Sequence, residues 1–170
     1  AKLDPVHKNL IKENLIHGIE VANELTFSEE AFEIALENNL TILGTSDIHG
    51  ISDWLFEIPE GGHRPLTYIL SNDLKQNSIK KALFMGNTFV WFEDLIAGKE
   101  EILSSIIASN FKVESKGYTG ETALLEISLT NLSSLPLKLK YIGDYTFHQY
   151  SDFLEVPAKN TVTVQVKTVK

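Results

Sequence analysis

An aspartate and a histidine two residues apart give the strongest chemical signal in this 170-residue sequence. Asp47 and His49 follow Thr41–Thr45, a short apolar run typical of a β-strand. In extended backbone, residues i and i+2 project to the same side, so the carboxylate and the imidazole can point together. Both groups bind divalent ions such as zinc, manganese and iron. We therefore predict that Asp47 and His49 are metal ligands. The alternative is a turn-capping aspartate beside an exposed histidine, since such triplets often arise by chance.

Three further polar residues are candidates for substrate binding. His63 and Arg64 follow a glycine pair, and a guanidinium can hold a phosphate through two parallel hydrogen bonds. Asn23 ends a predicted strand that should open onto the same side as Asp47. The competing interpretations are a solvated surface pair for His63 and Arg64 and a turn-forming role for Asn23. We assign no catalytic residue, and Glu20 is not assigned to metal.

The first half of the chain must position these residues, and it alternates strand-like and helix-like segments. Ser28, followed by two glutamates, is a good N-cap for a helix. Strands alternating with helices indicate βαβ units and a mainly parallel sheet. The predicted strands cover 16–22, 41–45, 65–70 and 88–92, the helices cover 29–38, 75–85 and 100–109, and a loop covers 51–64.

The second half changes period. Residues 121–130, 137–142 and 161–169 alternate apolar and polar side chains, with turn residues between them. Period-two segments joined by short turns indicate a small antiparallel β-sandwich. The fold class is therefore α/β plus all-β, with one domain over residues 1–110 and a second over 111–170. The border should lie near residues 108–118.

Composition narrows the partners. The net charge is −8 with no long basic run, so we expect no nucleic-acid partner. A phosphate ester is still a possible substrate, because bound cations supply positive charge locally. No apolar stretch approaches the length of a membrane span, and we expect no membrane partner. The absence of cysteine excludes disulfides and thiolate metal sites.

Two motifs resemble a known enzyme family. The sequence Gly-Ile-Glu-Val-Ala-Asn at 18–23, a helix, and Leu-Gly-Thr-Ser-Asp-Ile-His at 43–49 resemble the closing part of the PHP (polymerase and histidinol phosphatase) phosphoesterases. Residues 63–67, 79–83 and 90–92 look like the later segments of phosphodiesterase-like members. The resemblance covers about residues 3–105, and 43–49 is its most specific part.

The resemblance implies a fold and a chemistry. It implies the C-terminal portion of a (β/α)7 barrel, similar to a TIM barrel, that holds two or three divalent metal ions. Asp47 and His49 would be the last two ligands, on different ions of the cluster, and metal-activated water would hydrolyse a small phosphomonoester or phosphodiester. Relatives of this kind are often exported, which implies a periplasmic location; the sequence itself does not fix the compartment.

This sequence departs from the family pattern in one important respect. The family's His-x-His, bridging Glu and further His ligands should precede residue 18, but His7 and His17 lack that spacing. The sequence starts at Ala1 rather than Met, so we expect it to belong to a longer protein. We predict a fragment that binds metal weakly and is inactive alone. Half a barrel exposes strand edges and an apolar face, so we expect self-association or a missing N-terminal partner.

A non-catalytic alternative stands beside the hydrolase hypothesis. The chain would then be a binding or scaffolding module that acts through its β domain, and Asp-x-His would be incidental. The direction of the Asp47 and His49 side chains separates the two hypotheses.

Overall fold

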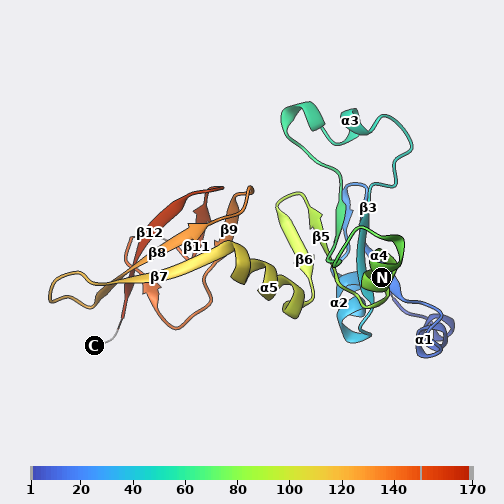
Figure 1. Ribbon diagram of the computed structural model, residues 1–170, viewed down its shortest axis with the longest axis horizontal. Coiled ribbons are helices and arrows are strands. Elements are labelled where there is room, and N and C mark those ends of the chain that lie inside the picture. Colours follow the sequence, from blue (N-terminus) through green and yellow to red (C-terminus); the bar gives the residue numbers. More distant parts are fainter. Residues whose placement is uncertain (1, 150, 169–170) are drawn as a thin grey trace. The chain divides into compact units, whose positions relative to one another are not determined.

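Two three-stranded sheets frame the first part of the chain (Figure 1). The computed structural model describes residues 2–149 and 151–168, and the chain divides into unit 1, Ala1–Leu103, and unit 2, Ser104–Lys170. The elements of unit 1 are α1 (Pro5–Lys12), β1 (Gly18–Asn23), β2 (Thr26–Phe27), α2 (Glu29–Glu37), β3 (Thr41–Thr45), α3 (Ser52–Leu55), the 3-10 helix η1 (Ile58–Glu60), β4 (Leu66–Ile69), α4 (Gln76–Phe84), β5 (Thr88–Phe92) and β6 (Leu95–Gly98). Helix α5 (Glu100–Asn110) crosses the border between the units.

Short-range signals account for the first βαβ segment. Ser28 caps α2 by accepting a hydrogen bond from the Ala31 N–H at 3.2 Å, and the Phe27 and Phe32 rings meet with centroids 6.0 Å apart. Helix α2 then carries the chain back so that β3 pairs parallel to β1. Strand β2 pairs antiparallel on the other edge of β1. This part of unit 1 has the βαβ arrangement that the sequence predicts.

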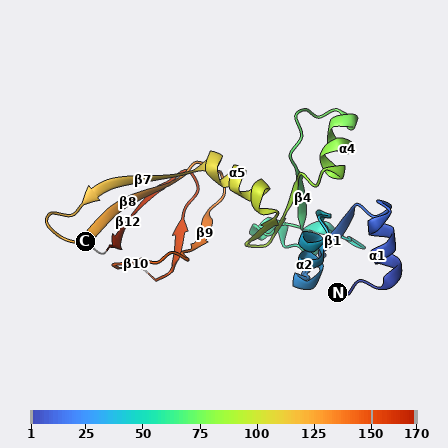
Figure 2. The same ribbon diagram turned by 90° about the horizontal axis from the view of Figure 1, so that it is seen from below.

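The prediction of a mainly parallel sheet is wrong for the remainder of unit 1. Strands β4, β5 and β6 form an antiparallel sheet. Helix α4 is not a crossover but an insertion between paired strands, since Ile69 pairs with Thr88 and the Leu70 N–H donates to the Asn87 carbonyl at 2.9 Å. Figure 2 shows α4 at the end of β4. A tight turn with Glu93 at φ 50° then leads into β6, which the sequence analysis missed.

The predicted loop over 51–64 also contains structure, namely α3 and η1. The described residues of unit 1 thus form two three-stranded sheets, and the barrel implied by the family resemblance stays a prediction. Within residues 2–149 and 151–168, no helix has the length and apolar character to cross a membrane.

Strand β3 is joined to β4 and β5 through threonine side chains. Thr88 Oγ1 donates to the Ile42 carbonyl at 2.7 Å, and Thr67 Oγ1 both accepts from the Gly44 N–H and donates to its carbonyl at 2.8 Å. A side chain at Gly44 would place its Cβ 2.7 Å from Val90 Cγ1, so the strands approach to a distance that only glycine permits here. The core packs around this contact and includes Val21, Ala22, Ala31, Ala35, Leu40, Ile42, Val90 and Phe92.

Unit 2 is an antiparallel β-sandwich. Its strands are β7 (Phe111–Tyr118), β8 (Leu124–Asn131), β9 (Leu137–Lys140), β10 (Thr146–Phe147), β11 (Phe153–Val156) and β12 (Thr161–Lys167). One sheet has the order β10-β12-β8-β7, and the other pairs β11 with β9. Leu129, Val164, Leu154 and Val156 from the two sheets form the core. The alternating segments correspond to β8, β9 and β12, while β7, β10 and β11 were not predicted; Val169 of the third segment lies outside the described residues.

Candidate functional site

Asp47 and His49 meet just beyond the tip of β3. Asp47 Oδ1 lies 3.4 Å from His49 Nε2, and the two side chains are 53% and 83% exposed. Strand β3 ends at Thr45, and Asp47 has a left-handed backbone with φ 41°. Aspartate tolerates this conformation better than most residues. The two groups therefore converge because of a turn, not because of the extended backbone on which the sequence analysis relied.

Glu20 fastens the base of this turn to the neighbouring strand. Its carboxylate accepts a hydrogen bond from the Thr45 hydroxyl and another from Asn23 Nδ2, the latter at 3.0 Å. Thr45 is the last residue of β3 and stands two positions before Asp47. The chain thus holds the strand end from which the Asp47 turn departs. Sequence reasoning left Glu20 without a role, and its only signal was the polar side chain in the middle of an apolar strand.

Asn23 lies at the turn between β1 and β2. Its side chain donates to Glu20, and its carbonyl accepts from the Thr26 hydroxyl at 2.9 Å. Glu24 follows with φ 52°, and its N–H donates to the Thr45 carbonyl at 3.2 Å. The structure therefore brings Asn23 to the same strand ends as Thr45, where it stabilises a turn.

His63 and Arg64 form a second group, at the turn between β5 and β6. His63 Nδ1 lies 2.9 Å from the Arg64 carbonyl oxygen and Nε2 lies 3.0 Å from the Glu93 carbonyl oxygen. The His63 ring packs on Trp91 with centroids 3.9 Å apart. His63 thus ties the end of loop 51–64 to this turn, and the Arg64 side chain is exposed to solvent.

The donors gathered at the β3 tip suit a divalent ion in type but not in number. One carboxylate and one imidazole converge, whereas a zinc site usually has three or four protein ligands. In the part of the chain that the structure describes, no group of three or more His, Cys, Asp or Glu side chains could hold an ion. Any closed site at Asp47 and His49 would need further ligands.

Comparisons with known proteins bear on both units. Residues 111–170 match the family model of an Ig-like domain. The sandwich topology of these residues agrees with that match, and we refer to residues 111–170 as the Ig-like domain from here on. No curated protein matches the sequence.

A solved structure resembles nearly the whole chain. It is a two-domain protein from Bacteroides vulgatus ATCC 8482, described as containing a predicted PHP-like metal-dependent phosphoesterase. The two proteins share 31% sequence identity with a TM-score of 0.84, over 97% of this chain and 48% of the Bacteroides protein. The chain therefore spans about half of that relative, and its likeness includes both unit 1 and the Ig-like domain.

Proposed function

We propose that this chain forms part of a metal-dependent phosphoesterase of the PHP type, in which Asp47 and His49 are two ligands of a divalent ion. The observation that carries the proposal is the 3.4 Å separation between Asp47 Oδ1 and His49 Nε2. Two donors that each lie about 2.1 Å from one ion at the tetrahedral angle are about 3.4 Å apart. The separation therefore allows both donors to bind one ion. The similarity to the Bacteroides protein, which is described as containing a predicted metal-dependent phosphoesterase, supports the proposed enzyme class.

The residues around the pair have separable roles in this proposal. Glu20 and Thr45 hold the end of β3, and the left-handed turn at Asp47 aims the carboxylate toward the imidazole. When bound, a zinc, manganese or iron ion supplies Lewis acidity and positive charge for the attack of water on a phosphomonoester or phosphodiester. The exposed Arg64 is the candidate for binding a phosphate oxygen. The further ligands and the remainder of the barrel come from outside these 170 residues.

Metal titration tests the assignment directly. Calorimetry with Zn²⁺ or Mn²⁺ should show weak binding by the intact 170-residue chain, because only two donors converge. Asp47→Asn and His49→Gln should each abolish that binding. Asp53→Asn, which removes a neighbouring carboxylate in the first turn of α3, is the matched control and should leave it unchanged. Tight binding that survives Asp47→Asn, or equal losses in Asp53→Asn, would contradict the proposal.

We further propose that apolar side chains exposed on unit 1 are covered in the complete enzyme. Exposed apolar side chains in this unit include Trp54, Leu74, Phe84 and Met85. Either the preceding part of the barrel or a second copy of the chain would remove them from water. Light scattering on the 170-residue chain should show self-association, and a monomer at all concentrations would count against this.

A binding role for the Ig-like domain is the second candidate function. The observation that favours it is an apolar pocket of about 440 Å³ between the two sheets of that domain, open to solvent on one side. If Asp47→Asn loses metal binding while ligand binding in the apolar pocket is unchanged, the two functions are independent.

A further inference from the structure

Strand β7 forms one edge of the Ig-like domain. The four-stranded sheet ends at β7 on one side and at β10 on the other, and no strand in the described part of the chain pairs with the outer side of β7. Strand β7 has eight residues, seven of them exposed, whereas β10 has only two residues. An edge of this length offers unpaired backbone groups to a further strand.

The hydrogen bonds at the end of β8 show which backbone groups of β7 point outward. The Leu132 N–H donates to the Asn110 carbonyl at 2.7 Å, toward β7, whereas the Asn131 N–H donates to the Asn160 carbonyl at 2.9 Å, toward β12. Because this direction alternates along a strand, the even-numbered residues of β7 bond to β8 and the odd-numbered ones face the free edge. In the regular part of the strand, the outward-facing N–H and carbonyl groups belong to Phe111, Val113 and Ser115.

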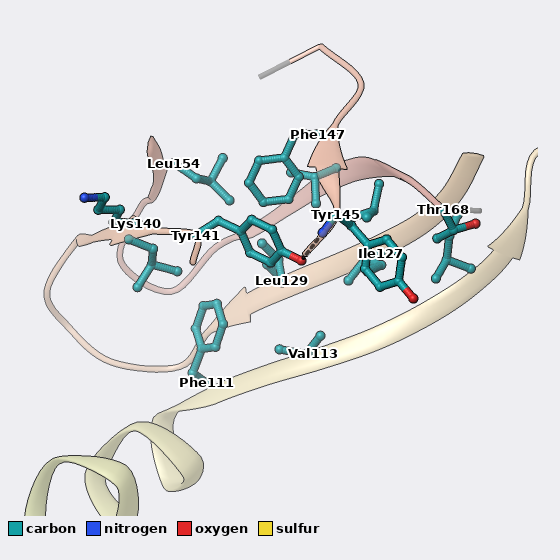
Figure 3. Close-up of a pocket in the computed structure, with 14 residues that line it drawn as sticks. Phe111, Val113, Ile127, Leu129, Lys140, Tyr141, Tyr145, Phe147, Leu154 and Thr168 are labelled. Atoms are coloured by element: carbon teal, nitrogen blue, oxygen red, sulfur yellow. Dashed lines mark hydrogen bonds between the residues drawn. The ribbon is translucent and has the colours of Figure 1, made fainter. Parts of the chain in front are cut away.

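The side chains of β7 divide into an apolar face and a charged face. Phe111 and Val113 line the apolar pocket between the sheets, and Figure 3 shows both on the same side of the strand. Val113 is 61% exposed despite this inward direction. Lys112 and Glu114 project to the opposite face, where Lys116 Nζ donates to Glu114 at 3.3 Å. The outer face thus carries charges of alternating sign.

These charges select one register for an antiparallel copy of β7. When Val113 lies opposite its own copy, Lys112 lies opposite Glu114 on both sides of the two-fold axis. Sliding the copy by two residues in either direction sets Glu114 against itself or Lys112 against itself, which is unfavourable. A longer slide that pairs Glu114 with Lys116 has to cross the irregular pairing between Ser115 and Gly117.

We propose that the Ig-like domain pairs with a second copy of this chain through β7, as an antiparallel two-fold dimer centred on Val113. The Val113 N–H and carbonyl of each copy then bond to those of the other, and Phe111 bonds to Ser115 on either side. The two Val113 side chains come into contact and lose exposed apolar surface. The proposal does not depend on the phosphoesterase assignment, because every residue in it belongs to unit 2. So short an interface predicts a weak, reversible dimer.

Charge reversal provides the sharpest test. Lys112→Glu and Glu114→Lys each set like charges opposite each other at both ends of the interface, so each should weaken self-association at least about tenfold. An equimolar mixture of the two variants restores opposite charges and should associate as strongly as the unaltered chain. Sedimentation equilibrium from micromolar to millimolar concentration measures this. Net charge cannot produce the pattern, because the two reversals move the value of −8 in opposite directions.

A substitution in the backbone of the edge tests the same register. Val113→Pro removes the outward-facing N–H at the centre of the interface and should abolish the dimer, whereas an edge strand tolerates proline when that N–H faces away from the sheet. Lys116→Glu is the matched control on the charged face of β7, outside the paired segment, and it should associate as the unaltered chain does. A loss in Lys116→Glu equal to that in Lys112→Glu would overturn the proposal.

Amide exchange distinguishes pairing through β7 from association through unit 1. The Val113 N–H should gain protection as the concentration of the chain rises, while the Lys112 N–H, which faces β8, should not change. Circular dichroism must show that each variant keeps its β structure, and the charge reversals supply the test if Val113→Pro does not fold. A chain that stays monomeric at millimolar concentration, or associates without protecting Val113, overturns the proposal. So does a mixture of the two reversed variants that associates no better than either alone.

Discussion

The two units join their layers in different ways. In unit 1, β3 lies so close to β5 that Gly44 has no room for a side chain, and threonine hydroxyls bond to the β3 carbonyls. In the Ig-like domain, apolar side chains hold the sheets apart and leave a cavity of about 440 Å³. Close contact leaves no space for a ligand between layers but holds the end of a strand firmly. Wide spacing leaves room for a ligand between the sheets but restrains the strand ends less. The polar candidate site therefore lies at a strand tip, and the apolar pocket lies between sheets.

The largest effect should come from removing a polar link in the widely spaced unit. Asn131 is fully buried in β8, and its side chain donates to the Leu135 carbonyl at 2.7 Å and to the Val156 carbonyl of the opposite sheet at 3.1 Å. Asn131→Leu removes both of these donations and leaves the Ser133 N–H without its acceptor, while the Leu135 carbonyl still accepts from the Ser133 hydroxyl at 2.9 Å. We expect the free energy of unfolding to fall by about 2–4 kcal/mol in chemical denaturation.

Ser133→Ala is the matched control for that link. It removes one hydroxyl that donates to Asn131 Oδ1 and leaves the contact between the sheets intact. The cost should be about 1 kcal/mol. Equal costs for the two substitutions would show that Asn131 does not join the sheets, and the contrast between the units would then rest on apolar packing alone.

A smaller effect should follow from widening the tight contact in unit 1. Gly44→Ala places a methyl group 2.7 Å from Val90 Cγ1, and we expect a loss of about 1–3 kcal/mol from overpacking. Val90→Ala on the same background removes the clashing methyl groups. The two substitutions together should therefore cost less than the sum of the two alone, as measured by a double-mutant cycle in urea. Additive costs would mean that the strands are free to separate.

The smallest effect concerns α1, at the edge of unit 1. The His7 N–H donates to Asp4 Oδ1 at 3.0 Å, and this bond holds the pKa of Asp4 below its ordinary value of 3.8. Because the folded-state pKa is lowered, the cap contributes fully above pH 3.8 and is lost as the pH falls through the folded-state pKa. The protection of the α1 amides, expressed relative to their intrinsic exchange rate at each pH, should therefore fall on acidification. Asp4→Ser keeps a capping oxygen that does not titrate, and its α1 should lack this step.

Local signals predicted those elements that local interactions stabilise. Residues 41–45 were predicted as a strand and β3 has these bounds, while the helix predicted over 29–38 is α2, Glu29–Glu37. Both depend on neighbouring residues, through the Ser28 cap and a continuous apolar run. Strand β6 escaped prediction because Leu95–Gly98 has no alternating pattern and is defined by its pairing with β5. The antiparallel direction of β4 and β5 likewise comes from long-range pairing.

The candidate site was predictable in its residues but not in its geometry. A carboxylate and an imidazole after a strand could be recognised, yet the left-handed backbone at Asp47 leaves no mark in the sequence. The bonds of Glu20 to Thr45 and Asn23 require two strands to be adjacent. Asn131 provides the opposite case: its Asn-Leu-Ser triplet resembles a glycosylation acceptor, but the side chain is buried and serves the sandwich.

The irregular pairing in β1 has a consequence for how this protein can change over evolution. Glu20 pairs with Leu43 and Ala22 with Gly44, so one extra residue at Val21 bulges the strand, and Val21 and Ala22 are both buried. The bulge lets Glu20 and Asn23, three positions apart, project to the same face as Thr45, whereas strict alternation over three positions would place them on opposite faces. Point substitutions along β1 do not change the face of the sheet to which these side chains project. Insertions and deletions in β1 should therefore be rarer among functional homologues than substitutions at the same positions.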